Sequence, residues 1–512
     1  MNALSASTDA TPKKTVRWVI AVAAAALLFD GYDLVVYGTV VSSLLRDPSQ
    51  LGALDAAQAG ALGSYALMGV MVGALTAGAV GDFLGRRKMM LINIVWFSLG
   101  MAFTAMAASV PAFGILRFLT GIGVGALVAT AGAVVAEFAP AGKRNFYNAI
   151  VYSGVPAGGL LASLLAIMLG GVTDWRGLFM IGALPLVILF PLAYFKLPES
   201  PRWLLARGRT EDAIRLSVKT GIPLEDPATG GPAPGKATGN ATGQATGKAA
   251  GAGTVAPPPA VGRGGRQLAG FAALASGNYR TPTILLGLMS FCGLLLTYGL
   301  NTWLPEIMGQ HGYGKTYSLT FLLALNAGAV IGGLVASRSA DRFGPRAIVA
   351  TTFVIAAGAL VLLTFDFPLP VLLVAVAFAG VGSLGTQVLV YGFVSNYYPT
   401  PARGAGVAWC AGFGRLGGIF GPLVGGFLIS AQAPSNVAFI VFAAVALAGG
   451  VVTVFVRRHR SSGVDGGSGR ADVQQVPVPQ DSAPRKSVPQ ESVPQESVPQ
   501  ESVPQGSGHW GA

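Results

Sequence analysis

Twelve apolar stretches follow one another along this 512-residue chain, and each is about as long as a membrane-spanning helix. A transmembrane helix needs about 20 mostly apolar residues to cross the hydrocarbon core of a bilayer. The chain is therefore predicted to be an all-α polytopic membrane protein with twelve transmembrane helices. The stretches cover residues 17–43, 59–80, 89–108, 111–137, 147–170, 175–195, 281–304, 317–337, 347–365, 369–394, 403–430 and 436–456.

The composition and the placement of charge agree with this prediction. Charged residues make up 11% of the chain, whereas a soluble domain carries roughly 25%. Lys and Arg gather in alternate loops, for example at 86–88 and 143–144, and in the segments that precede residue 18 and follow residue 456. Since cytoplasmic loops carry the excess of Lys and Arg, both termini are predicted to be cytoplasmic in a multi-pass protein of the inner (plasma) membrane.

Five segments are expected from these patterns. Residues 220–266 are mostly Gly, Ala, Thr and Pro, so they are predicted to be a flexible linker, and the repeats of Glu-Ser-Val-Pro-Gln near the C-terminus predict disorder. The segments are a cytoplasmic N-terminal segment at 1–16, an N-terminal six-helix bundle at 17–195, a cytoplasmic central loop at 196–280, a C-terminal six-helix bundle at 281–456 and a disordered cytoplasmic tail at 457–512.

The two predicted bundles repeat each other in sequence. The separation between Asp82 and Asp341 also relates Arg144 to Arg403, and the sequences around both pairs are alike. Arg117 has no counterpart at this offset. Duplicated halves around a central loop are typical of transporters built from structural repeats, with the substrate site between the repeats.

Two carboxylates interrupt the first apolar stretch. Asp30 and Asp33 are three residues apart, so they lie on neighbouring positions of one helix face. A charged group in the middle of a membrane costs about 2.5–3.5 kcal/mol on insertion scales, and such groups usually mark ion or proton pathways. The two acids are therefore candidates for proton coupling. The alternative interpretation is a structural pair, hydrogen-bonded to neighbouring helices.

Several motifs give the chain a resemblance to the major facilitator superfamily across nearly all of residues 15–460. The loop after the second stretch resembles the family signature, although Phe83 stands where a basic residue is common. The resemblance implies two pseudo-symmetric six-helix bundles. The motifs are Gly78-x-x-x-Asp82-x-x-Gly85-Arg86-Arg87, Arg117-x-x-x-Gly121-x-Gly123-x-Gly125 and Pro198-Glu199-Ser200-Pro201-Arg202-Trp203.

Within that superfamily, Asp30-Gly31-Tyr32-Asp33 resembles the D-G-[FY]-D pattern of the aromatic acid–proton symporters. The sequences 301–305 and 398–417 are similar to other motifs of that branch. The resemblance implies that the cargo is a small aromatic carboxylate such as a benzoate or a hydroxybenzoate.

Two arginines are candidates for binding the carboxylate of such a cargo. From the rise of a helix, Arg117 and Asp33 both lie in the outer half of the membrane, so a contact between them is geometrically possible, and Arg415 lies near the depth of Asp30. A guanidinium group can hold a carboxylate by two parallel hydrogen bonds. Tyr32 is the aromatic residue predicted to stack on the cargo ring. The alternative for both arginines is a structural partnership with the acids.

A second group of charged residues is predicted to gate the cytoplasmic ends of the bundles. In the family pattern Asp82 and Arg86 act on the bundle arrangement rather than on the cargo. Glu137 is placed to pair with Arg86 or Arg87, and a role in passing protons is its alternative. The full predicted set is Asp82, Arg86, Arg87, Glu137, Asp341 and Arg403.

The leading hypothesis is a proton-coupled importer of an aromatic acid, working by rocking of the two bundles. A proton-driven exporter of drugs or metabolites is the second, because the Gly-x-Pro pattern at 154–156 resembles drug–proton antiporters, and a non-transporting membrane sensor is the third. The glycines at 121–125 lie in a membrane helix with no preceding strand, so they do not predict a nucleotide loop. The histidines form no metal set or catalytic triad, so no enzyme activity, cofactor, metal or nucleic-acid partner is expected.

Overall fold

The computed structural model describes residues 13–139, 144–220, 274, 279–398 and 400–456. Within these residues the chain is helical, and twelve helices are long and apolar enough to cross a membrane. The predicted fold class is thereby confirmed, with span ends that mostly fall within a few residues of the predicted ones. The predicted linker at 220–266 lies almost wholly outside the described residues, as do residues 1–12 and the tail from residue 457.

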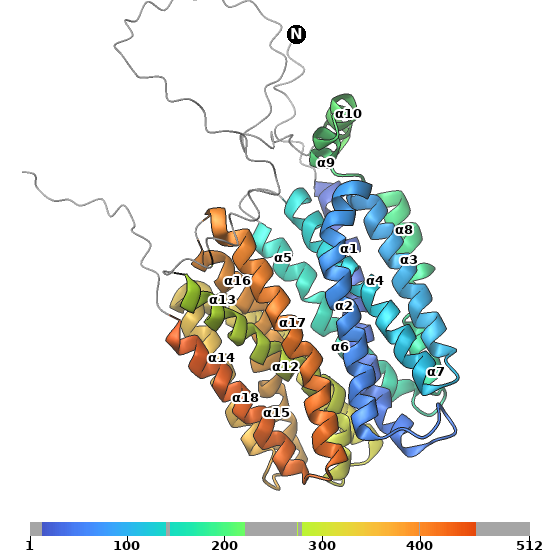
Figure 1. Cartoon of the computed structure of the whole chain (residues 1–512), viewed down its shortest axis with the longest axis vertical. Helices are drawn as coiled ribbons and strands as arrows, with labels where there is room; N and C mark the ends of the chain where they lie inside the picture. The colour runs from blue at the N-terminus through green and yellow to red at the C-terminus, as the bar shows by residue number, and fades with distance from the viewer. Residues whose placement is uncertain (1–12, 140–143, 221–273, 275–278, 399, 457–512) are drawn as a thin grey trace, which may run out of the picture. The chain divides into compact units, whose positions relative to one another are not determined.

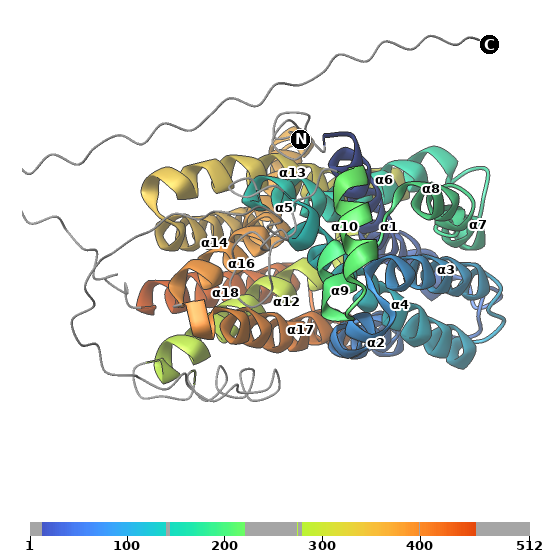
Figure 2. The same cartoon turned by 90° about the horizontal axis from the view of Figure 1, so that it is seen from above.

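The helices form two groups, which Figure 1 shows side by side and Figure 2 shows from above. The first group, called the N-half here, consists of α1 (Lys13–Arg46), α2 (Ala56–Leu84), α3 (Arg86–Ala105), α4 (Val110–Phe138), α5 (Arg144–Tyr152), α6 (Gly154–Leu169), α7 (Trp175–Ile181), η1 (Leu184–Leu186) and α8 (Leu189–Lys196). Two short helices follow it, α9 (Pro201–Ala206) and α10 (Thr210–Thr220). The second group, the C-half, consists of α12 (Arg280–Gln310), α13 (Lys315–Phe343), α14 (Pro345–Leu362), α15 (Leu369–Gly380), η2 (Val381–Gly385), α16 (Thr386–Tyr397), α17 (Thr400–Ser430) and α18 (Ser435–Phe455).

Prolines divide two of the N-half spans into shorter helices. Proline has no N–H to donate to the carbonyl four residues earlier, so a helix tends to end there. Pro156 lies four residues after Tyr152, where α5 ends, and Pro185 lies four residues after Ile181, where α7 ends. The fifth span is therefore broken at its Gly-x-Pro pattern.

The tenth span is irregular for a different reason. Between α15 and α16 the backbone forms one π-helical turn, η2, over Val381–Gly385. Gly382 within this turn lies so close to α14 that an added Cβ would be 2.2 Å from the carbonyl oxygen of Thr352. Such turns are frequently found at functional sites. The turn immediately precedes Gln387 and Tyr391, which belong to the candidate site.

Glycines bring helices of the N-half into backbone contact. A Cβ at Gly121 of α4 would lie 2.1 Å from the carbonyl oxygen of Ala66 in α2, and one at Gly125 would lie 2.0 Å from that of Val70. Only a residue without a side chain permits this approach, as in other membrane helix pairs. The glycines of this motif therefore pack α4 closely against α2.

The two halves meet at the end of the molecule that carries the α1–α2 connection, which we call the outer end after the predicted topology. A Cβ at Gly38 of α1 would lie 1.9 Å from the carbonyl oxygen of Asn301 in α12. In the contact between α2 and α17, Ser64 Oγ donates a hydrogen bond of 2.7 Å to the carbonyl oxygen of Ile419. The halves therefore touch backbone to backbone at this end.

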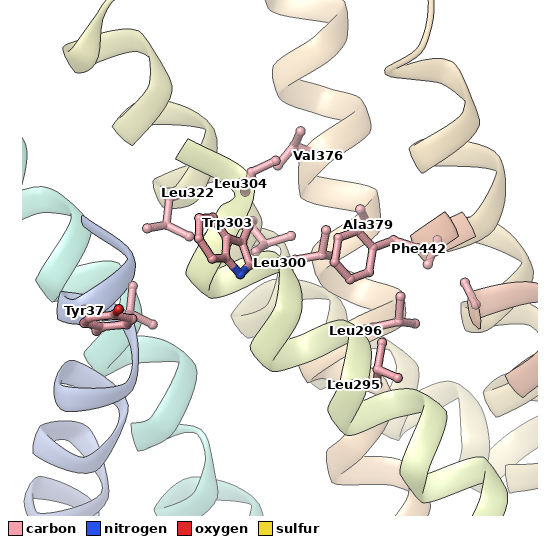
Figure 3. Packing of buried hydrophobic residues seen from close by; sticks show 14 of the residues in the cluster. Tyr37, Leu295, Leu296, Leu300, Trp303, Leu304, Leu322, Val376, Ala379 and Phe442 are labelled. Atoms are coloured by element: carbon pink, nitrogen blue, oxygen red, sulfur yellow. The ribbon is translucent and has the colours of Figure 1, made fainter. Parts of the chain in front are cut away.

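The largest apolar cluster includes residues of both halves. In Figure 3, Trp303 of α12 lies between Tyr37 of α1 and Phe442 of α18. The indole N–H of Trp303 donates a 2.7 Å hydrogen bond to the carbonyl oxygen of Pro422, so its polar atom is satisfied. A separate cluster at the opposite end of the N-half, which includes Leu27 and Val134, contains N-half residues alone.

Candidate functional site

Asp33 and Arg117 form a buried ion pair inside the N-half. The guanidinium of Arg117 donates to Asp33 Oδ1, and the two residues are 3% and 2% exposed. The same guanidinium lies 5.5 Å from the ring centroid of Tyr37 and 5.6 Å from that of Phe179, so aromatic faces cover its remaining surface. The predicted contact between Asp33 and Arg117 is present, and it leaves Arg117 almost no exposed surface for a ligand.

Tyr32 points in a direction that its sequence position did not predict. Its side chain is fully buried, and its hydroxyl donates a 2.7 Å hydrogen bond to the carbonyl oxygen of Leu178 in α7. The ring therefore packs α1 against α7 within the N-half. The expectation that this ring stacks on a cargo is not supported by its position, since neither its faces nor its hydroxyl are accessible.

Arg415 lies in a cluster of polar groups that both halves supply, which we call the Arg415 cluster. Arg415 of α17 interacts electrostatically with four residues, and its Nη1 lies 3.4 Å from the hydroxyl of Tyr298. Asp30 is 5% exposed, and Arg415 is partly buried. The four partners are Asp30 of α1, Tyr152 of α5, Tyr298 of α12 and Tyr391 of α16.

Helix irregularities help to place this cluster. Tyr152 is the last residue of α5, directly before the break caused by Pro156, and Tyr391 follows the π-helical turn. Gln387, one turn before Tyr391, donates a 3.1 Å hydrogen bond to Ser290, and its buried amide oxygen has no donor among the described residues. A cation, three phenol groups and a free amide acceptor are suited to bind a carboxylate with a polar substituent.

Arg86 is held by acidic residues at the end of the N-half opposite to the outer end. Arg86 Nε lies 2.9 Å from Glu137 Oε1. Of the two partners predicted for Glu137, Arg86 is therefore the one that it contacts. Its backbone N–H and that of Arg87 donate to Glu199 Oε1 at 2.8 and 3.1 Å. Glu199 therefore caps α3 from a distant segment, next to Gly85, whose φ of 92° suits a glycine.

The remaining predicted gate residues are less completely described. Arg87 does not pair with Glu137, since its Nη2 donates a 2.6 Å hydrogen bond to the carbonyl oxygen of Tyr194. Asp341 is exposed near the end of α13. The side chains of Asp82 and Arg403 lie outside the described part of the structure, although their backbones belong to α2 and α17.

Sequence reasoning missed two polar contacts near the outer end. Arg46 of α1 approaches Glu306 of α12, with 3.6 Å between Nη2 and Oε2, and Glu306 is 8% exposed. Asn326 Nδ2 of α13 donates a 2.9 Å hydrogen bond to Asn301 Oδ1 of α12. An acid so near the end of an apolar stretch was a usable signal for Glu306, whereas the asparagine pair has no sequence pattern.

The fold and the buried charged groups define the class of the protein, a polytopic membrane transporter built from two six-helix bundles. The model of the Major Facilitator Superfamily matches residues 16–337 and 286–491, and the chain belongs to this family. Among solved structures, a D-xylose–proton symporter has a TM-score of 0.63 at 18% identity and covers 86% of this chain and 98% of its own. At this sequence identity, the structural similarity is evidence for the fold and not for the substrate.

Curated relatives agree with the branch indicated by the motifs of the first span. A benzoate transport protein of Acinetobacter baylyi is 31% identical over 86% of this chain and 89% of its own length. A gentisate transporter of Corynebacterium glutamicum is 32% identical over 82% of this chain and 83% of its own. A 4-hydroxybenzoate transporter of Acinetobacter baylyi is 28% identical, with coverages of 82% and 86%.

Proposed function

We propose that this protein imports a small aromatic carboxylate together with protons by alternating access. The observation that carries the proposal is the Arg415 cluster, in which residues of both halves interact electrostatically with one cation and one of them is a buried acid. The relatives named for benzoate, gentisate and 4-hydroxybenzoate transport support this class of cargo. In the membrane, the cargo carboxylate binds Arg415 and its ring lies among the tyrosines.

Proton coupling follows from the electrical cost of importing an anion. An inside-negative potential opposes entry of a monoanion by about 2.3 kcal/mol per 100 mV, and one accompanying proton removes that opposition. Asp30 is our candidate for the proton-coupling acid because it shares the environment of Arg415. A cargo anion at Arg415 favours a proton on Asp30, since two adjacent negative charges repel each other. Asp33 is a second candidate, and its protonation requires separation from Arg117.

The contacts between the halves support an alternating-access mechanism. The described inter-half contacts at Gly38 and Ser64 lie at the outer end, while the opposite end of the N-half has an apolar cluster of its own. We propose an inner-membrane location with cytoplasmic termini, so that this arrangement is closed to the outside. The predicted gate set around Asp82, Arg86 and Glu137 would then act when the cytoplasmic ends close.

The test uses the full chain in proteoliposomes, with radiolabelled benzoate, 4-hydroxybenzoate and gentisate supplied in turn. We expect uptake driven by an inside-alkaline gradient, and Arg415→Gln should raise the substrate dissociation constant at least about tenfold, because a charge-assisted contact is lost. Gradient-driven extrusion would instead support the exporter suggested by the broken fifth span. Binding without flux would support a sensor, and unchanged affinity in Arg415→Gln would remove the anion site.

A further inference from the structure

A cavity of about 350 Å³ opens near the outer end, away from the Arg415 cluster. It lies among α1, α6, α7 and the first turns of α13, so both halves contribute to its wall. Its volume falls within the range of small-molecule sites, roughly 300–1,000 Å³. The wall includes Thr39, Ser43, Gly171, Trp175, Lys315 and Leu319.

The charged and polar groups of this cavity favour an anion with a ring. Lys315 is exposed and makes no ion pair within the described part of the chain. The other charged lining residue, Asp174, is engaged by the first turn of α7, where its Oδ1 accepts from the N–H groups of Arg176 and Gly177. The ammonium group of Lys315 is therefore the charged group of the lining that can bind a ligand.

Trp175 lines the cavity from the first turn of α7 and is 3% exposed. Arg176 Cζ lies 4.4 Å from the centroid of its ring, so Trp175 contributes wall to the cavity rather than a polar group for a ligand. Apolar side chains such as Leu178 and Leu319 complete the wall and suit the face of an aromatic ring.

We propose that this cavity is a second, outer binding site for an aromatic carboxylate, separate from the Arg415 cluster. The carboxylate binds the Lys315 ammonium, and the ring lies against the apolar wall. Because the site touches α6 and α7 of one half and α13 of the other, an occupant favours the arrangement in which the outer end is closed. This inference rests on the proposed function, since it assigns to the cavity the same class of ligand.

Two substitutions remove the outer site without touching the Arg415 cluster. Lys315→Gln removes the cation, and Gly171→Leu fills the cavity from a position where no atom lies within 4 Å of an added Cβ. Gly314→Leu is the matched control, because it is equally open, lies next to Lys315 and does not line the cavity. Each full-length variant is purified into nanodiscs and titrated with radiolabelled benzoate, 4-hydroxybenzoate and gentisate.

We expect two bound ligands per chain for the unaltered protein and for Gly314→Leu, and one for Lys315→Gln and for Gly171→Leu. The site that the two cavity variants lose should bind its ligand with the same dissociation constant in Arg415→Gln as in the unaltered protein. A single site in the unaltered protein, or two sites in both cavity variants, overturns the outer site. Normal affinity and transport in Arg415→Gln overturns the proposed central site alone, and no binding of any of these acids to the unaltered protein overturns both.

Discussion

At the scale of single residues, the two acids of α1 differ because a small rotation separates them. Three residues advance a helix by about 300°, so Asp30 and Asp33 point about 60° apart around its axis. That rotation places Asp33 against Arg117 inside the N-half and Asp30 in the environment of Arg415, between the halves. The sequence spacing indicates a shared face, and the packing of neighbouring helices decides the partners.

Asp33→Asn should destabilise the protein, because it leaves the buried guanidinium of Arg117 without its counter-charge. The loss of one member of a buried pair costs about 3–5 kcal/mol. Thermal unfolding in detergent measures the effect, and the double variant Asp33→Asn/Arg117→Gln should recover part of the loss. Lys315→Gln is the control, because Lys315 is exposed and makes no ion pair among the described residues, so a much smaller shift is expected. Equal melting temperatures in Asp33→Asn and the unaltered chain would contradict a structural ion pair.

Asp30→Asn should separate binding from coupling. The substituted side chain cannot take up a proton, so accumulation driven by an inside-alkaline gradient should be lost while substrate binding persists within about tenfold of the unaltered chain. Substrate binding and proton flux are measured on the same purified protein. Full accumulation in the Asp30→Asn variant would remove Asp30 from the coupling mechanism.

At the scale of helices, close contacts depend on residues that have no side chain. Gly38 allows α1 to approach α12, and Gly121 allows α4 to approach α2. The contact at Gly38 joins different halves, whereas the contact at Gly121 lies within one half. An added methyl group should therefore affect the outer closure in the first case and the stability of the N-half in the second.

Gly38→Ala should shift the protein toward an arrangement that is open at the outer end. An added Cβ would lie 1.9 Å from a backbone oxygen, which no side-chain rotation relieves. We expect uptake to fall, and a cysteine introduced at Ser64 to react faster with a membrane-impermeant maleimide. Gly358→Ala is the control, because no atom lies within 4 Å of its Cβ. Identical labelling in both variants would show that this contact does not hold the outer end closed.

Much of the element order was predictable because membrane helices are long, apolar and separated by short polar loops. The break before Pro156 was also predictable, since a proline acts on the residue four positions earlier. The direction of Tyr32 was not, because several helices surround each span and a periodic pattern does not say which neighbour a face meets. The grouping of Tyr152 with Arg415 likewise depends on tertiary packing that no local pattern encodes.

At the scale of the whole molecule, the two halves of the sequence repeat correspond to the two groups of helices, and a long stretch of sequence connects them. The charge distribution predicts on which side of the membrane that connection lies. Reporter fusions at residues 240 and 462, both outside the described residues, should report a cytoplasmic location. A periplasmic signal at either position would be incompatible with twelve spans and the predicted orientation.

The backbone contacts between the halves also affect how this family can diversify. Near Gly38 the outer closure depends on main-chain atoms and on the absence of a side chain, whereas the Arg415 cluster consists of side chains carried on other helices as well. Substitutions that alter the shape or polarity of the cluster therefore leave the closure surface chemically intact. Under the proposed function, exchanging a few tyrosines or amides of the cluster would change which aromatic acid is preferred, and the backbone contacts between the halves would stay as they are.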